Sequence, residues 1–107
     1  MPTYTLAEVA QRSGEKGVAW VIIKGVVYDV TNNEVYRAKG GYNCFAGKDA
    51  TEALAKMDFE VVGSRDWRRK LNFEQLLVLD EWAKWYASRY KKVGYLKEDY
   101  DFETKNK

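Results

Sequence analysis

Residues 18–30 read VAWVIIKGVVYDV, and this stretch decides the fold. β-Branched and aromatic residues dominate it, which is typical of strands, and Lys24-Gly25 interrupts it with a pair suited to a tight turn. The pattern predicts a β-hairpin. Residues 93–96 (VGYL) are predicted to add one further strand to the sheet of this hairpin.

Three N-cap patterns predict helix starts on either side of the hairpin. The pairs are Thr5 with Glu8, Asp49 with Glu52, and Asn72 with Gln75. In each pair the first side chain can accept from a free backbone N–H, while the side chain three positions on can reach back to the cap. The last helix, over residues 72–89, carries an apolar stripe with spacings of three and four. The stripe consists of Leu76, Leu79, Trp82, Ala83, Tyr86 and Tyr90.

Residues 31–47 lie between the hairpin and the second helix and follow neither the period of a helix nor that of a strand. We expect a loop with a short helix at residues 33–36. The order of helix, hairpin, irregular loop, two helices and returning strand predicts an α+β fold, with helices beside a small mixed sheet and a pocket where the loop meets the helices. The domain is predicted to cover residues 1–96, and residues 97–107 to be a polar tail with little folding power.

The composition narrows the classes of function. A chain of 107 residues with 46% apolar residues supports one domain. A net charge of +2, with acidic residues spread among basic ones, argues against a nucleic-acid partner. No paired carboxylates, no nucleophile beside a base and no cofactor loop emerge from the spacing, so we do not expect an enzyme.

Cysteine and histidine content restricts the chemistry further. Cys44 is the only cysteine, which excludes an internal disulfide and favours a reducing compartment. We expect Cys44 to be a buried small apolar residue rather than a thiolate ligand. No histidine is present, so the commonest metal ligand is missing. The longest purely apolar run, residues 18–23, is far shorter than the roughly 20 residues that span a bilayer, which predicts no transmembrane segment and a cytoplasmic location.

Two stretches resemble the opening of the cytochrome b5-like fold: YTLAEV at residues 4–9 and IIKGVVYDVT at residues 22–31. Ordinary members of that superfamily then carry His-Pro-Gly-Gly, whose histidine binds haem iron. This chain has AKGG at residues 38–41 instead. The bis-histidine mechanism of ordinary cytochrome b5 is therefore excluded.

Residues 36–51 resemble a more specific pattern, Tyr-x5-Tyr-x-x-Phe-Ala-Gly-[Arg/Lys]-Asp-Ala-[Ser/Thr], of the membrane-associated progesterone receptor (MAPR) family. Trp82 and the stretch RYKKVG at residues 89–94 fall where that family has a helix with a Trp, a basic-Tyr pair and Val-Gly. The resemblance covers about residues 3–96. It implies a heme- and steroid-binding domain.

The resemblance also implies roles for four residues. Tyr42 matches the tyrosine that is the axial ligand of haem b iron in the family, and Tyr36 matches the tyrosine that supports the site. Arg89 and Tyr90 match the basic-Tyr pair near the haem, where Arg89 can pair with a propionate and Tyr90 can donate to a propionate or to Tyr42. Phenolate is a known protein ligand of haem iron, and the charge of ferric iron favours this anionic form.

Several readings of function stay open. The first is a non-catalytic haem-binding domain that regulates P-450-type monooxygenases or sterol metabolism through partners, peripheral at the endoplasmic reticulum membrane. The second is a haem-free interaction or sterol-binding module, supported by Arg37 and Ala38, which replace a Gly-Pro-like pair of the relatives. An electron carrier is a third reading, weakened by the missing histidines. A haem-dependent dimer is a further expectation, because a five-coordinate haem leaves one flat apolar face exposed.

Overall fold

The computed structural model describes residues 1–105, and its centre is one mixed four-stranded sheet. The strands are β1 (Thr3–Tyr4), β2 (Trp20–Ile23), β3 (Val26–Asp29) and β4 (Lys91–Leu96), in the order β1-β4-β3-β2. β2 and β3 form the predicted hairpin, in which Lys24 and Gly25 both have positive φ. β4 pairs antiparallel with β3 and parallel with β1. The hairpin, the returning strand and the α+β class are confirmed, whereas β1 is too short to have given a sequence pattern.

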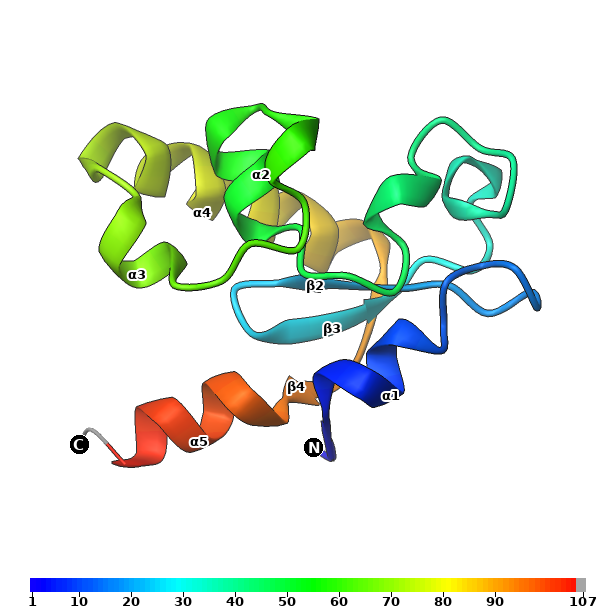
Figure 1. Ribbon diagram of the computed structural model, residues 1–107, viewed down its shortest axis with the longest axis horizontal. Helices are drawn as coiled ribbons and strands as arrows, with labels where there is room; N and C mark the ends of the chain where they lie inside the picture. The colour runs from blue at the N-terminus through cyan, green and yellow to red at the C-terminus, as the bar shows by residue number, and fades with distance from the viewer. Residues whose placement is uncertain (106–107) are drawn as a thin grey trace.

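Helices cover both faces of the sheet (Figure 1). The α-helices are α1 (Leu6–Ala10), α2 (Thr51–Lys56), α3 (Trp67–Lys70), α4 (Phe73–Arg89) and α5 (Lys97–Lys105). Three short 3-10 helices are η1 (Glu34–Tyr36), η2 (Asn43–Phe45) and η3 (Phe59–Val61). α2, α3 and α4 lie above the sheet in the view of Figure 1, while α1 and α5 lie below it. Within residues 1–105, no helix is long and apolar enough to cross a membrane.

This arrangement buries the hairpin on both sides. Val21 and Ile23 belong to the larger core, which also contains residues of α2 and α4. Trp20 and Ile22 face the other way and pack in a smaller core with Val9 of α1. Side chains alternate between the two faces of a strand, so a run of four apolar residues fits a strand whose two faces are both covered by helices.

Two of the three predicted helix caps are confirmed. Thr5 and Glu8 form a capping box at α1, and Asn72 and Gln75 form another at α4. The cap predicted at Asp49 is wrong. The Asp49 carboxylate does accept from the Thr51 N–H, at 3.0 Å, but α2 begins after Ala50 and Glu52 pairs with Lys56 instead of reaching back. The reason is that Asp49 forms a parallel bridge with Ile22 of β2, so its backbone belongs to the sheet.

The C-terminal segment also differs from expectation. Residues 97–105 form α5, so the prediction of a tail with little folding power is wrong for them, while residues 106 and 107 lie outside the described residues. Asp99 of α5 is only 5% exposed. It accepts from Arg65 at 3.1 Å and from Arg68 at 3.1 Å, and Arg65 also donates to Asp49 at 2.8 Å. The arginines lie more than 30 positions earlier, so the local polar composition could not reveal this anchor.

Replacing Asp99 by asparagine should therefore destabilise the fold. The variant Asp99→Asn removes the buried charge that Arg65 and Arg68 share, while Arg65 keeps Asp49 and Arg68 keeps Glu103. We expect the free energy of unfolding to fall by about 1–3 kcal/mol. Urea denaturation measures this change. The matched control is Asp101→Asn on the same helix, where the ion pair with Lys97 has side chains 43% and 51% exposed. We expect about 0.5 kcal/mol or less for it, because exposed pairs contribute little. Equal losses in the two variants would contradict the anchoring role of Asp99.

Candidate functional site

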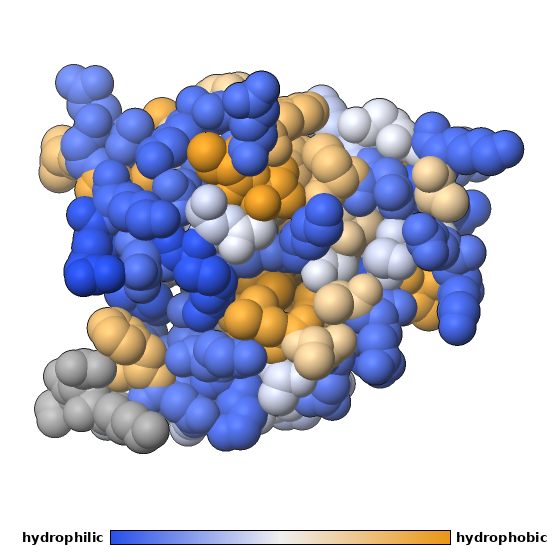
Figure 2. Space-filling model, viewed as in Figure 1, coloured by the Kyte–Doolittle hydropathy of each residue, from blue (hydrophilic) through white to orange (hydrophobic). Residues whose placement is uncertain are grey.

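A cavity of about 910 Å³ opens between α4 and the segments η2, α2 and η3. This volume lies in the range of small-molecule sites. Its walls are mainly aromatic and aliphatic. The aromatic residues are Tyr36, Tyr42, Phe45, Phe59, Trp82, Trp85 and Tyr86. Figure 2 shows apolar side chains reaching the surface over α2, among charged groups. The cavity is therefore suited to a flat, largely apolar ligand.

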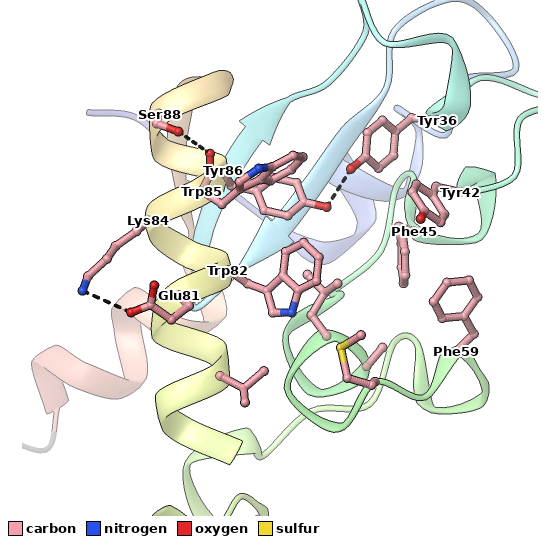
Figure 3. Close-up of a pocket in the computed structure, with 14 residues that line it drawn as sticks. Tyr36, Tyr42, Phe45, Phe59, Glu81, Trp82, Lys84, Trp85, Tyr86 and Ser88 are labelled. Carbon is pink, nitrogen blue, oxygen red and sulfur yellow. Dashed lines mark hydrogen bonds and ion pairs between the residues drawn. The ribbon is translucent and has the colours of Figure 1, made fainter. Parts of the chain in front are cut away.

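Tyr42 forms the wall opposite α4 and presents its hydroxyl to the cavity (Figure 3). Its side chain is 44% exposed, and its ring packs against Phe45 and Phe59 with centroids 5.7 and 5.9 Å apart. The Tyr42 N–H donates to the Val35 carbonyl at 2.8 Å, which fixes the loop behind the ring. Within residues 1–105, no protein group hydrogen-bonds to the Tyr42 hydroxyl. That oxygen is thus available to a ligand.

Tyr36 and Tyr86 form a second polar feature, deeper in the same cavity. Their hydroxyl oxygens lie 2.7 Å apart, and both residues are only 2% exposed. Burial, followed by the hydrogen bond to Tyr86, raises the pKa of Tyr36, and burial raises the pKa of Tyr86 to about 12. Both groups therefore stay protonated at neutral pH. The hydroxyls of Tyr36 and Tyr86 can therefore act as hydrogen-bonding groups, whereas the hydroxyl of Tyr42 is the one that is accessible to a ligand.

Arg89 and Tyr90 lie beside this cavity rather than in it. They line a neighbouring polar depression of about 680 Å³ together with Asn33. The Arg89 guanidinium stacks on the Trp85 ring at 4.6 Å, and the Tyr90 hydroxyl accepts from Asn33 Nδ2 at 2.9 Å. The Tyr90 ring meets the Tyr36 ring edge-on, with centroids 6.1 Å apart. The structure therefore brings Tyr36 and Tyr42 together in the cavity and places Arg89 and Tyr90 at its border.

Among the aromatic residues of the cavity, Tyr86, Trp85 and Phe59 were neither predicted as site residues nor part of the motifs that carry the family resemblance. Tyr86 was assigned to the buried stripe of the long helix, and it is indeed buried, but one end of its ring reaches the cavity. Trp85 lies one position before Tyr86 and beside that stripe, and no sequence pattern indicated that it would line the cavity. Phe59 lies in η3, for which the sequence gave no periodic pattern. The one sequence signal was the presence of Tyr86 within an apolar stripe. A buried tyrosine needs a hydrogen-bond partner, which indicates a polar feature next to the core.

Cys44 is exposed, so the prediction that it is buried is wrong. η2 spans only three residues, and it turns Phe45 inward, at 2% exposure, while Cys44 faces outward. Cys44 is also absent from the cavity lining. Among the residues that the structure describes, no group of three or more His, Cys, Asp and Glu side chains could hold a metal ion.

The cavity has the features that a haem site needs. Aromatic walls can stack on both faces of a planar macrocycle, and the open hydroxyl of Tyr42 supplies a ligand type that binds haem iron. The polar groups of Arg89 and Tyr90 at the border suit the propionate end of such a ligand. The residues present therefore fit the group.

Comparison with known proteins agrees with this geometry. Residues 5–97 match the family described as cytochrome b5-like heme/steroid binding domain. Membrane steroid-binding protein 2 of Oryza sativa is 43% identical over 76 residues, which are 70% of this chain and 29% of that protein. Cytochrome P450 regulator dap1 of Schizosaccharomyces pombe is 35% identical over 102 residues, covering 87% of this chain and 61% of that protein. The chain thus spans less than two thirds of these two relatives.

A solved structure supports the same assignment. A protein of Arabidopsis thaliana with a cytochrome b5-like fold superposes with a TM-score of 0.76 at 30% sequence identity, over 90% of this chain and 91% of that one. The predicted fold and the predicted resemblance to the MAPR family are confirmed. The chain belongs to the cytochrome b5-like heme/steroid binding domain family.

Proposed function

We propose that this chain binds ferric haem b in the aromatic cavity, with Tyr42 as the iron ligand, and that it acts without turnover of its own. The observation that carries the proposal is the Tyr42 hydroxyl, which faces the cavity with no hydrogen-bond partner in the described part of the chain. In this proposal the Tyr36 ring packs against the ring of Tyr42 and supports it. Arg89 and Tyr90, at the border of the cavity, bind the haem propionates.

The chemistry of the site follows from its ligands. A free tyrosine has a pKa of about 10, so binding as phenolate at neutral pH needs a strong positive charge nearby, which ferric iron supplies. The chain has no histidine, so Tyr42 would hold the iron without the second imidazole of an ordinary cytochrome b5, which would leave the other haem face open. An anionic ligand stabilises Fe(III) over Fe(II). This weighs against an electron carrier and for a regulatory binding domain.

The relatives support a regulatory role. One is named a cytochrome P450 regulator, and several are named membrane steroid-binding proteins. By analogy, the proposed partners of this chain are P-450-type monooxygenases or enzymes of sterol metabolism, and the proposed location is the cytoplasmic side of the endoplasmic reticulum membrane. The open haem face would also allow a haem-dependent dimer.

An absorption titration of the purified chain with ferric haem tests the proposal. We expect saturable binding of one haem per chain and a high-spin, tyrosinate-type spectrum. Light scattering before and after loading measures the dimer, and equal masses in the two states would remove it. The absence of saturable haem binding would overturn the haem assignment.

A sterol is the second candidate ligand. The aliphatic part of the cavity wall, which includes Ala53, Leu54 and Met57, supports it, because these residues offer contact area without charge. In the same titration, a sterol that displaces haem or binds the haem-free chain with saturation would favour this reading.

A further inference from the structure

The hydroxyls of Tyr36 and Tyr86 have two protons, but the hydrogen bond between them uses only one. The two oxygens lie 2.7 Å apart, and either can be the donor. Two phenol groups carry two protons, and only one of them lies between the oxygens. Both residues are 2% exposed, so water satisfies the second proton poorly. The Tyr90 hydroxyl is a further hydrogen-bonding neighbour of Tyr36. When donation runs from Tyr90 through Tyr36 to Tyr86, the Tyr86 proton is left without an acceptor in the protein, which is destabilising at a buried position, and an acceptor in the cavity can take it.

The cavity side of the pair faces Tyr42. Tyr86 reaches the cavity from α4 and Tyr42 from the position just before η2, and Figure 3 shows their hydroxyls bordering the same space. Burial raises the pKa of Tyr86 to about 12, so its hydroxyl keeps its proton at neutral pH. In the described chain, the Tyr36 hydroxyl is the only hydrogen-bond partner of the Tyr86 hydroxyl.

We propose that Tyr86 is a positioning residue of the haem-loaded site: its hydroxyl accepts from Tyr36 and, once haem is bound, donates to the phenolate oxygen of Tyr42, a bond that the described chain does not make without the ligand. This assignment rests on the proposed function. A phenolate oxygen keeps lone pairs after it binds iron, and a hydrogen bond to an ionised acceptor is stronger than one to a neutral acceptor. The Tyr36 hydroxyl behind Tyr86 strengthens that donor, because hydrogen bonds in a chain polarise one another.

The hydrogen bond has a measurable electronic consequence. Groups that hydrogen-bond to a metal ligand tune the metal through that ligand. The ligand oxygen is more negative when the iron is Fe(II), so donation from Tyr86 stabilises the ferrous state more than the ferric state and raises the reduction potential. Removing the donor should therefore lower the potential of the bound haem and shift the phenolate-to-iron charge-transfer band to lower energy.

The test is a redox titration of the haem-loaded chain and its Tyr86→Phe variant. We expect the preference for ferric over ferrous haem to rise about tenfold, which lowers the midpoint potential by about 59 mV for one electron. The matched control is Tyr28→Phe. Tyr28 is also 2% exposed, and its ring lies 5.8 Å from that of Tyr86, but it does not line the cavity. Its potential should match that of the unmodified chain.

Tyr36→Phe identifies which hydroxyl is the donor. It removes the partner of Tyr86 and leaves the Tyr86 hydroxyl in place, so the potential should fall by less than in Tyr86→Phe. A larger fall in Tyr36→Phe overturns the assignment to Tyr86. If Tyr86→Phe does not retain haem, the reduction potential of Tyr36→Phe is the test. A potential equal to that of the unmodified chain then overturns the proposal.

The outcomes separate the two proposals. Haem binding that depends on Tyr42, with a potential in Tyr86→Phe equal to that of Tyr28→Phe, overturns the role of Tyr86 and leaves the proposed function in place. Haem binding that is absent or indifferent to Tyr42 overturns the proposed function, and the role of Tyr86 falls with it.

Discussion

The Tyr42→Phe variant should lose at least about 100-fold in affinity for ferric haem, together with the tyrosinate-type spectrum. The substitution removes only the oxygen and keeps the ring, so the contacts of Tyr42 with Phe45 and Phe59 are retained. The other two tyrosines that line the cavity are not comparable phenolate ligands, because Tyr36 and Tyr86 are hydrogen-bonded to each other and have raised pKa values. Equilibrium titration followed by absorption measures the affinity and the spectrum together.

The stability of the fold should hardly change in Tyr42→Phe. The side chain is 44% exposed and its hydroxyl has no partner within residues 1–105, so the free energy of unfolding should stay within about 0.5 kcal/mol. A suitable control is Tyr95→Phe, a tyrosine 38% exposed on β4 and outside the cavity, which should bind haem normally. Unchanged affinity in Tyr42→Phe would remove Tyr42 as the ligand.

The fold was largely predictable because its main signals are local. The hairpin has dense strand-forming residues and a two-residue turn, and two capping boxes lie within four-residue windows. The features that escaped prediction depend on distant partners. Asp49 is held by β2 and by Arg65, and α5 is held by arginines of a preceding loop and of α3. Nothing in the sequence around these carboxylates indicates which side chains will meet them.

The site was predictable only in part, and for a similar reason. Tyr42 and Tyr36 were found through a motif within one loop, and the structure places both at the cavity. Tyr86 lies 50 positions from Tyr36, and a periodic apolar stripe does not say which of its members reach a cavity. Arg89 and Tyr90 were expected near the haem from the resemblance, and their place at the border leaves that role a prediction.

Gly40, in the loop that carries Tyr42, is required by a close approach of two backbone segments. A Cβ added at Gly40 would clash with the Val35 carbonyl oxygen and would lie 2.5 Å from that of Glu34. The Val35 carbonyl also accepts from the Tyr42 N–H at 2.8 Å. Gly40 thus allows the loop to fold back tightly on η1, and this contact sets the position of Tyr42.

Gly40→Ala should therefore damage both the fold and the site. The neighbouring atoms belong to the backbone of η1 and cannot move aside as a side chain would, so the loop must shift. We expect the free energy of unfolding to fall by about 1–3 kcal/mol. The ligand should be displaced with the loop, and haem affinity should fall at least about tenfold. Urea denaturation and the haem titration measure the two effects on the same preparation.

Gly41→Ala is the matched control, because it makes the same change one position further on. A Cβ at Gly41 meets no atom within 4 Å, and the residue does not have positive φ. Its stability should be unchanged or rise by up to about 1 kcal/mol, since alanine restricts the unfolded chain more than glycine does. Its haem affinity should match that of the unmodified chain. If the two variants bind haem equally well, the fold-back at Gly40 does not position the ligand, and the ring contacts of Tyr42 with Tyr36, Phe45 and Phe59 hold it instead.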